Sequence, residues 1–327
     1  MAPPPEVLTS DAKRQFRRKL SLWYGKNRRD LPWRQDHNPY RVWLSEIMLQ
    51  QTRVAAVIEH YRRFLLRFPT VEKLASSREA SVLAAWSGLG YYRRARMLHA
   101  AARTIVKQHR GKFPDKAEQL RDLPGVGRYT AAAIASIAFN EPVAVVDGNV
   151  QRVLQRLLGR NLTGEKLWKA AEDILDRRSP GEHNQAMMEL GATICLPRQP
   201  LCLVCPVSTW CATRGEIARP KTPSRQAKRE IHYALSRRND SVFLTRRAKD
   251  AQLMPGFWEL PEVSQPPLHT KPWLTLRHSI TVTDYTVKVI PCQPLVGVAG
   301  NWVRTSRVST LPLTGLARKI LSAAGFI

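Results

Sequence analysis

Four of the five cysteines of this chain lie within seventeen residues, in the spacing Cys195-x6-Cys202-x2-Cys205-x5-Cys211. Thiols this close in sequence are typical of a metal site, and four thiolates bind either zinc or an iron–sulfur cluster. Structural zinc sites usually carry two separated Cys-x2-Cys pairs, whereas here one such pair is flanked by single cysteines. The spacing therefore favours a 4Fe-4S cluster, in which each iron takes one thiolate.

Disulfide bonds are the alternative interpretation of clustered cysteines, and they are typical of exported proteins. The first eight residues, MAPPPEVL, have neither the basic start nor the apolar core of a secretory signal. No apolar run approaches the roughly twenty residues that span a membrane. We therefore expect reduced thiols, no membrane association and a cytoplasmic location. Cys292, alone in the segment VIPCQPL, is expected to be a small buried residue.

The charge balance indicates a polyanionic partner. The chain has 52 Lys and Arg against 26 Asp and Glu, which gives a net charge of +26 and a pI near 10.6. The excess lies on both sides of residue 222, so we expect a nucleic acid to contact both parts of the chain. Charge alone leaves open a cationic protein without a partner, or one bound at a membrane surface.

A change of periodicity divides the chain. Before residue 219, apolar residues recur at helical spacing over Val42–Phe68, Ser81–Gln108 and Thr163–Arg177. Residues 219–229, RPKTPSRQAKR, combine two prolines with five basic residues and are interpreted as a linker. We predict a mostly α domain over residues 1–218.

Beyond the linker the apolar period becomes two. The segments Ile231–Leu235 and Val242–Thr245 flank the turn residues RRNDS, which predicts a β-hairpin, and Tyr285–Ile290 alternates like a further strand. We predict an α+β domain over residues 230–327.

Residues 118–138 are predicted to form a helix-hairpin-helix. A helix is expected to end at Leu123, Gly125 and Gly127 permit a tight turn, and the run TAAAIASIAF from Thr130 favours a second helix. Such a hairpin points backbone N–H groups and a helix N-terminus toward solvent. That arrangement suits a DNA phosphate and does not depend on DNA sequence.

An aspartate follows this hairpin at the end of an apolar segment. Asp147 lies in VAVVDGNV, after four apolar residues and before a glycine, so it is expected to open the next helix. Capping that helix is the ordinary role for such a residue. A carboxylate at this place can cap the helix and take part in catalysis at once.

These motifs make the chain resemble the helix-hairpin-helix DNA glycosylases with an iron–sulfur cluster, the superfamily of endonuclease III, and more narrowly the MutY-type adenine DNA glycosylases. The resemblance is dense from about Trp23 to Cys211 and looser beyond. Bifunctional members carry a Schiff-base lysine where this chain has Tyr129, which cannot form an imine. The segment Trp43–Thr52 resembles the adenine-glycosylase signature, with its glutamate, Glu46, intact.

The resemblance implies two catalytic carboxylates. Adenine leaves readily only when a ring nitrogen is protonated, and the sugar left behind is a cation, so one group must donate a proton and another must stabilise positive charge. Glu46 lies among apolar neighbours that should raise its pKa, which suits the acid. Asp147 should stay ionised against the cation. Tyr129 and Asn149 match positions that support the aspartate and the transition state.

Binding residues follow from the same resemblance. An enzyme acting on a base within a duplex must extrude that base and brace the gap. The residues matching positions that wedge the duplex and touch the opposite base are Gln51, Thr52, Leu89 and Tyr91, with ordinary core packing as the alternative for Tyr91. Those matching the wall of the adenine pocket are Arg29, Trp33, Arg34 and Gln185.

The C-terminal part resembles the MutT-like (Nudix-fold) recognition domain of the family through Leu253–Pro261. It lacks the run of glutamates that holds magnesium in Nudix hydrolases, so we expect a binding module. Many relatives carry a Phe-Ser-His loop that touches the damaged guanine, where this chain has Ile280-Thr281-Val282. Thr281 keeps a hydroxyl and is the candidate contact.

The sequence thus predicts a monomeric, monofunctional adenine DNA glycosylase of bacterial nucleoid DNA. Its expected substrate is adenine opposite 8-oxoguanine or guanine in double-stranded DNA, with water as the nucleophile. Three alternatives are a bifunctional glycosylase/lyase, a thymine glycosylase for G:T mismatches, and an inactive DNA-binding protein. Tyr129 argues against the first, Glu46 and the long second domain against the second, and the presence of both carboxylates against the third.

Overall fold

A computed structural model describes residues 8–215, 227–248, 250–251, 253–264, 271–280, 283–294 and 297–327. The chain divides into two units, which are described separately. The first unit comprises Met1–Arg62, Thr70–Ala75 and Ala100–Pro220, and the second comprises Arg63–Pro69, Ser76–His99 and Lys221–Ile327. Most of the predicted linker lies outside the described residues, and its last three residues, 227–229, already belong to a strand.

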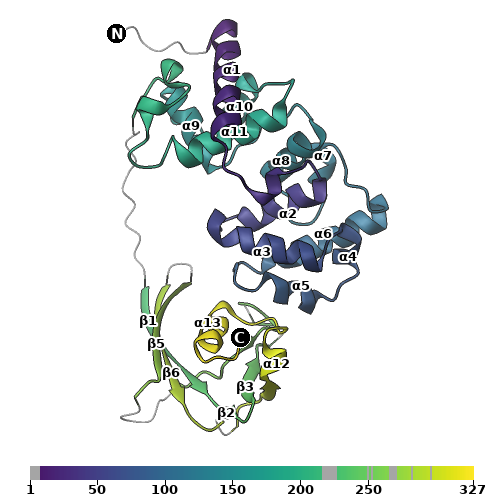
Figure 1. Cartoon of the computed structure of the whole chain (residues 1–327), viewed down its shortest axis with the longest axis vertical. Helices are drawn as coiled ribbons and strands as arrows, with labels where there is room; N and C mark the ends of the chain where they lie inside the picture. Colours follow the sequence, from purple (N-terminus) through teal and green to yellow (C-terminus); the bar gives the residue numbers. More distant parts are fainter. Residues whose placement is uncertain are drawn as a thin grey trace. The chain divides into compact units, whose positions relative to one another are not determined.

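Helices build the first unit, as the sequence predicts (Figure 1). Helices α3 and α6 each run from one unit into the other. The helical elements are α1 (Ser10–Asn27), η1 (Pro32–Arg34), α2 (Pro39–Leu49), α3 (Val54–Arg67), α4 (Val71–Ala75), α6 (Arg93–His109), α7 (Ala117–Leu120), α8 (Arg128–Phe139), α9 (Gly148–Leu158), α10 (Gly164–Ile174), α11 (Pro180–Thr193), η2 (Cys202–Val204) and η3 (Ser208–Trp210).

Helix α8 lies at the centre of this unit. Every residue from Thr130 to Ile137 is buried, and five of these eight residues are alanine or serine, whose small side chains let neighbouring helices approach. Helices α2, α7 and α11 pack against it. The first turn of α8 is thereby held against α2, which places Tyr129 beside Glu46.

Helix α11 also packs against α9, and a glycine sets how closely. A Cβ atom at Gly191 would lie 2.6 Å from the Cβ of Asn149 and 2.9 Å from its carbonyl oxygen. Real Cβ atoms do not approach that closely, so only glycine allows this contact. The contact fixes the start of α9, where Asp147 and Asn149 lie.

Two stretches with helical apolar spacing each form two helices in the structure. The stretch Val42–Phe68 forms α2 and α3, separated at Gln50–Arg53, where Gln51 adopts a left-handed φ of 55° and Thr52 Oγ1 donates to the Gln50 carbonyl. Side-chain hydrogen bonds of this kind compete with helical ones. The stretch Ser81–Gln108 forms α5 (Glu79–Trp86) and α6, separated by a turn with Gly88 and Gly90 at positive φ.

In its described residues, the second unit contains two small sheets, the complete helices α5, α12 and α13, and one end each of α3 and α6. In the first sheet, of order β1-β6-β5, β1 and β6 are parallel and β5 and β6 antiparallel; in the second, β3 pairs with β2, β4 and β7. The elements are β1 (Ala227–Leu235), β2 (Arg237–Arg238), β3 (Ser241–Arg246), β4 (Trp258–Glu259), β5 (Leu274–Ile280), β6 (Thr283–Pro291), β7 (Asn301–Arg304), α12 (Thr305–Val308) and α13 (Gly315–Ala323). The α+β prediction is confirmed.

The core of this unit lies between the sheets and α13, which Figure 1 shows within the curve of the strands. Buried Val287 and Val289 from β6, Val242 and Leu244 from β3, and Ile320 from α13 all belong to one apolar cluster. The alternating pattern that predicts Tyr285–Ile290 as a strand corresponds to β6.

The predicted pairing of Ile231–Leu235 with Val242–Thr245 in one hairpin is wrong. Strand β3 forms a tight hairpin with the two residues of β2, around Asn239 and Asp240, and Asn239 has a left-handed φ of 50°. The segment Ile231–Leu235 instead pairs with β6 in the other sheet. Strand β1 ends before Ser236, and the turn residues connect β3 to the two-residue strand β2. The hairpin is therefore shorter than the alternating pattern over Ile231–Leu235 predicts.

None of the helices in the described part of the chain is both long and apolar enough to cross a lipid bilayer.

Candidate active site

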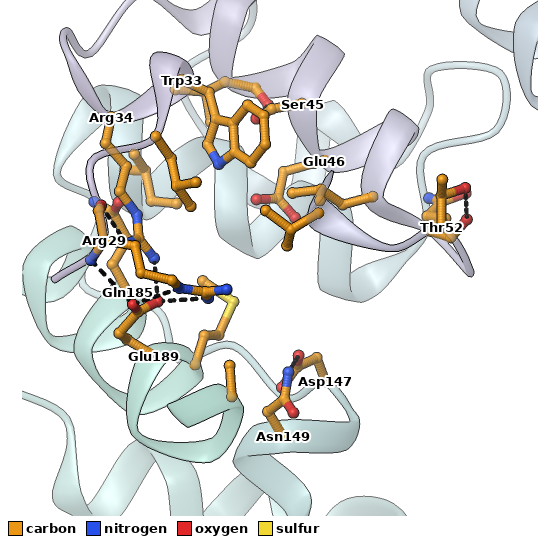
Figure 2. Close-up of a pocket in the computed structure, with 18 of the residues that line it drawn as sticks. Arg29, Trp33, Arg34, Ser45, Glu46, Thr52, Asp147, Asn149, Gln185 and Glu189 are labelled. Atoms are coloured by element: carbon orange, nitrogen blue, oxygen red, sulfur yellow. Dashed lines mark hydrogen bonds and ion pairs between the residues drawn. The ribbon is translucent and has the colours of Figure 1, made fainter. Parts of the chain in front are cut away.

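A cavity of about 370 Å³ opens in the first unit, and it collects most of the residues predicted from the sequence. Its walls come from η1, α2, the α2–α3 turn, α8, the segment before α9, and α11. The predicted residues that line it are Arg29, Trp33, Arg34, Glu46, Gln51, Thr52, Tyr129, Asp147, Asn149 and Gln185. In Figure 2, Glu46 faces the cavity from α2, across from Asp147 and Asn149.

Glu46 is a buried carboxyl with a raised pKa. The residue is 6% exposed, and Tyr129 Oη donates a hydrogen bond of 2.6 Å to its Oε2. Burial raises the pKa of Glu46 to about 7, with a further increase from the Asp147 carboxylate, while the Tyr129 hydrogen bond and Arg34 act in the opposite direction. A carboxyl with this pKa can carry a proton at neutral pH and release it to a base.

Tyr129 remains a phenol in this setting. Burial raises its pKa well above the ordinary value, and the negative charges of Glu46 and Asp147 raise it further. The hydroxyl also lies 3.3 Å from the sulfur of Met188. Tyr129 is therefore a proton-bearing donor that orients Glu46.

Asp147 caps helix α9, as the sequence predicts, and faces the cavity. Its Oδ1 accepts from Val150 N at 2.7 Å, and its Oδ2 accepts from Asn149 Nδ2 at 2.9 Å. Burial raises the pKa of Asp147, whereas hydrogen bonds from Val150 and Asn149 and the charge of Arg152 oppose that rise. Those donors favour the ionised carboxylate, which suits a group that stabilises a cation.

Asn149 is itself held by a buried guanidinium. Arg152 Nη2 donates to Asn149 Oδ1 at 2.8 Å and to the carbonyl of Gly191 at 2.6 Å. On its other side, Arg152 Nε donates to the carbonyl of Cys195 at 2.7 Å. One side chain thus joins the Asp147–Asn149 pair to the first residue of the cysteine array.

The opposite wall of the cavity is basic and aromatic. Arg29 and Arg34 both pair with Glu189 on α11, a buried residue that the sequence analysis did not single out. Trp33 packs edge-on against Tyr61, and Gln185 Oε1 accepts from Tyr24 Oη at 3.3 Å. The sequence does contain a signal for Glu189, because this glutamate lies within the apolar helical run AMMELGA. An unpaired carboxylate buried there would be costly, so the run indicates a basic partner.

The predicted duplex-wedging residues divide between the two units. Gln51 and Thr52 lie at the cavity in the α2–α3 turn. Leu89 and Tyr91 belong to the second unit and do not line this cavity; Leu89 is buried, and Tyr91 is 53% exposed with a left-handed φ of 48°. Thr281 lies outside the described residues. The exposed side chain and left-handed backbone of Tyr91 argue against the alternative that it is an ordinary core residue.

The hairpin has one conformationally required glycine. Gly125 has a φ of 76°, whereas Gly127, the N-cap of α8, has extended backbone that any residue can adopt. The turn therefore requires the conformational freedom of glycine at Gly125 and not at Gly127. No side chain caps α8, so its first N–H groups remain available for an anion.

The four cysteines lie in the segment that follows α11, around η2 and η3. All are reduced and half-buried. Burial raises the pKa of the Cys205 thiol to about 11, and the neighbouring Cys195, Cys211 and Cys202 add to this effect, so the four sulfurs lie within electrostatic reach of one another.

Two donors point at these sulfurs. Arg156 Nη1 lies 3.4 Å from Cys195 Sγ, and the backbone N–H of Arg214 donates to Cys211 Sγ at 3.4 Å. Within the described residues, no three His, Cys, Asp or Glu side chains are placed to hold a single metal ion. Hydrogen-bond donors at cysteine sulfurs are typical of the contacts that surround metal–thiolate sites.

The comparisons with known proteins concern mainly the first unit. Residues 44–176 match the family model of HhH-GPD superfamily base excision DNA repair proteins. The chain is 48% identical over 217 residues to an adenine DNA glycosylase of Rattus norvegicus. The aligned region covers 62% of this chain and 42% of that protein. The chain therefore spans less than half of the length of this relative.

Two solved structures share its fold. A thermostable thymine-DNA glycosylase superposes with a TM-score of 0.59 and 30% identity, covering 63% of this chain and 97% of that one. A non-covalent endonuclease III–DNA complex superposes with a TM-score of 0.53 at 24% identity, covering 63% and 96%, which shows a common fold.

Proposed function

Because the chain belongs to the HhH-GPD superfamily of base excision DNA repair proteins, in the branch of the MutY-type adenine DNA glycosylases, we propose that it releases adenine from duplex DNA. The reaction is hydrolysis of the N-glycosidic bond of adenine mispaired with 8-oxoguanine or guanine. The observation that carries this proposal is the pair formed by Glu46, with its raised pKa, and the hydrogen-bonded Asp147 on facing walls of one cavity.

In the proposed mechanism the adenine is extruded into the cavity and Glu46 donates its proton to a ring nitrogen, which makes adenine a leaving group. Tyr129 orients Glu46 through its hydrogen bond. The sugar becomes an oxocarbenium-like cation, and the Asp147 carboxylate stabilises it. Water then attacks the sugar carbon, so that the products are free adenine and an abasic site.

Tyr129 supports a monofunctional enzyme. A lyase of the endonuclease III type uses a lysine amine to form an imine with the abasic sugar. A phenol hydrogen-bonded to a carboxyl lacks that amine. One solved structure of similar fold is a thymine-DNA glycosylase, so removal of thymine from G:T mismatches is the alternative activity. The assay therefore includes a G:T duplex.

The cysteines Cys195, Cys202, Cys205 and Cys211 would hold a 4Fe-4S cluster. When bound, the cluster supplies four iron–thiolate bonds that hold the segment after α11 in place. Arg156 and the backbone of Arg214 would donate hydrogen bonds to its sulfur ligands. Through Arg152, the same segment supports Asn149 and so the catalytic carboxylate.

Recognition of the opposite base is proposed for the C-terminal part, as a Nudix-like module without hydrolase activity, with Thr281 contacting the oxidised guanine. The sheets of the second unit are compatible with such a module. Thr281→Ala and removal of residues 223–327 should both narrow the preference for A:8-oxoguanine over A:G, with the deletion also lowering the salt dependence of binding. Equal discrimination by the intact protein, the Thr281→Ala variant and the truncated protein would place recognition in the residues before 223, which include Gln51, Thr52 and Leu89.

The decisive experiment is single-turnover excision on A:8-oxoguanine, A:G, G:T and thymine-glycol duplexes, with and without alkali. We expect adenine release from the first two, with strand breaks only after alkali. Glu46→Gln keeps the size of the side chain but removes the proton, and loss of a general acid costs roughly 10²–10⁴-fold in rate. Release of thymine, or full activity of Glu46→Gln, would overturn the proposal.

A further inference from the structure

A buried carboxylate that the proposed chemistry does not use lies behind the basic wall of the cavity. The side chain of Glu189 has no exposed surface. Its Oε1 accepts from the main-chain N–H of Arg29 at 3.1 Å and from Arg29 Nε at 2.7 Å. Its Oε2 accepts from Arg29 Nη2 and from Arg34 Nη2, each at 2.8 Å. Two guanidinium groups thus share one carboxylate (Figure 2).

The hydrogen bonds keep Glu189 ionised in spite of its burial. Burial alone would raise its pKa, but the hydrogen bonds from Arg29 and Arg34 and the charge of Arg34 outweigh that effect and lower the pKa to about 2. Tyr24 is a further titratable neighbour, and its own pKa is raised chiefly by burial. Glu189 therefore carries a fixed negative charge across the pH range of a repair enzyme.

Glu189 also fixes where the guanidinium groups lie. Arg34 is 11% exposed, donates through Nη1 to the Arg29 carbonyl at 3.1 Å, and stacks over Tyr24 at 5.5 Å. Movement of either arginine away from the wall would remove hydrogen bonds from a carboxylate that has no exposed surface. Arg29 and Arg34 both line the cavity that the base would enter.

The charge of Arg34 has a second consequence inside the cavity. Burial is the largest influence on the pKa of Glu46, and Tyr129 from α8, Asp147 before α9 and Arg34 from η1 act on it in addition. Arg34 favours the ionised form of Glu46, which cannot donate a proton. The Glu189 carboxylate lies 2.8 Å from the Arg34 guanidinium, and its negative charge opposes the positive charge of Arg34.

We propose that Glu189 is a positioning residue for base excision: it fixes the guanidinium groups of Arg29 and Arg34 against the extruded base and shields Glu46 from the positive charge of Arg34. This inference rests on the proposed function, because it takes Glu46 as the proton donor. It explains why a pocket for a neutral base contains two arginines beside an acid that must stay protonated.

The first test is the pH profile of single-turnover excision at saturating enzyme. Glu189→Gln keeps an acceptor of the same size but removes the charge. We expect the midpoint of the alkaline limb to fall by about one pH unit, which is about a tenfold loss of rate at pH 8 and little loss at pH 5.5. Glu189→Asp keeps the charge, so its midpoint should stay at the parent value even where its rate is lower.

A second variant, in which the midpoint should move in the opposite direction, distinguishes a charge effect from a structural defect of the site. Arg34→Gln leaves the negative charge of Glu189 in place and should move the midpoint upward. The double variant Glu189→Gln/Arg34→Gln should return it toward the parent value. A structural defect would lower the rate in all variants without moving the midpoint in two directions. Identical midpoints in Glu189→Gln and the parent would overturn the inference.

A second measurement needs no reaction. The infrared band of the protonated Glu46 carboxyl, isolated as the difference between the parent and Glu46→Gln, can be titrated in the DNA-free protein. Its midpoint should fall in Glu189→Gln and rise in Arg34→Gln. If the parent releases no adenine, the proposed function fails, while this titration still decides whether Glu189 shields Glu46. An unchanged titration in both variants would refute the shielding even in an active glycosylase.

Discussion

Tyr129 Oη donates a 2.6 Å hydrogen bond to Glu46 Oε2, and this contact joins helix α8 of the hairpin to helix α2 of the signature segment. The bond lowers the pKa of Glu46, against the dominant effect of burial, and so keeps it near 7. Without this bond the carboxyl would hold its proton more tightly. The phenol therefore sets both the orientation and the acidity of the proposed proton donor.

Tyr129→Phe removes the hydroxyl and leaves the ring. The pKa of Glu46 should rise above about 7, because a donor to its ionised form is lost. Protonated Glu46 then persists to higher pH, so the alkaline limb of the single-turnover excision profile should shift upward while the maximal rate falls through lost orientation. A downward shift would show that the hydrogen bond stabilises the protonated form of the carboxyl instead.

Tyr129→Lys examines the same position for imine chemistry. A buried lysine beside two carboxylates sits where endonuclease III-like enzymes hold their nucleophilic amine, so we expect weak nicking at the abasic product and covalent trapping with borohydride. The unchanged protein should show neither beyond background. Strong trapping of the unchanged protein would favour the bifunctional alternative and point to another lysine.

Arg152→Met tests the link between the cysteine array and Asp147, the proposed catalytic aspartate. The change removes hydrogen bonds to Asn149 and to the Gly191 and Cys195 carbonyls, and a displacement of about 1 Å at Asp147 can cost roughly 10²-fold in rate. Excision rate per folded molecule and thermal unfolding are the measurements.

Arg156→Met is the matched control for that change. Arg156 is also buried and donates to the Leu196 and Pro197 carbonyls, but it does not contact Asn149. It should lower the unfolding temperature while sparing the rate of the folded fraction. Equal rate losses in both variants would mean that loop stability, and not support of Asn149, determines activity.

Local sequence rules predict those parts of the site that depend on neighbours in the chain. The helix of α8 follows from its alanine-rich run, and the capping role of Asp147 follows from its place before Gly148, where its Oδ1 accepts from Val150 N. The buried position of Glu46 follows from its apolar neighbours. Each of these features is determined within about four residues of sequence.

Features that depend on distant residues are not predictable in this way. The partners of Glu189 lie 155 and 160 residues away in sequence, so no local pattern identifies them. Gln51 adopts a left-handed backbone without glycine as a signal, and the break between α2 and α3 is therefore missed. The hairpin partner of β3 depends on which sheet β1 joins, which is also a long-range choice.

The cysteine array predicts the composition of the purified protein. Prepared under reducing, anaerobic conditions, it should contain about four irons and four sulfides and absorb broadly in the blue part of the visible spectrum. Cys202→Ala should lower the iron content and the unfolding temperature, because one of the four ligands is lost. A colourless protein with a single zinc ion would contradict the cluster.

Gly127→Ala separates the fold of the hairpin from its contact with DNA. Gly127 has φ of −89° and ψ of 177°, and a Cβ atom there would meet no atom of the protein within 4 Å. We therefore expect the free energy of unfolding to change by no more than about 1 kcal/mol. If a phosphate approaches the uncapped start of α8, the added methyl group lies in its path, and affinity for a duplex should fall about tenfold.

Gly125→Ala is the control with the opposite effect on folding, because a φ of 76° costs about 1–2 kcal/mol of folding free energy in any residue with a Cβ atom. Thermal denaturation of both variants, together with binding of an unreactive duplex at two salt concentrations, distinguishes the two effects. Unchanged affinity of Gly127→Ala would place the phosphate contact elsewhere on the basic surface.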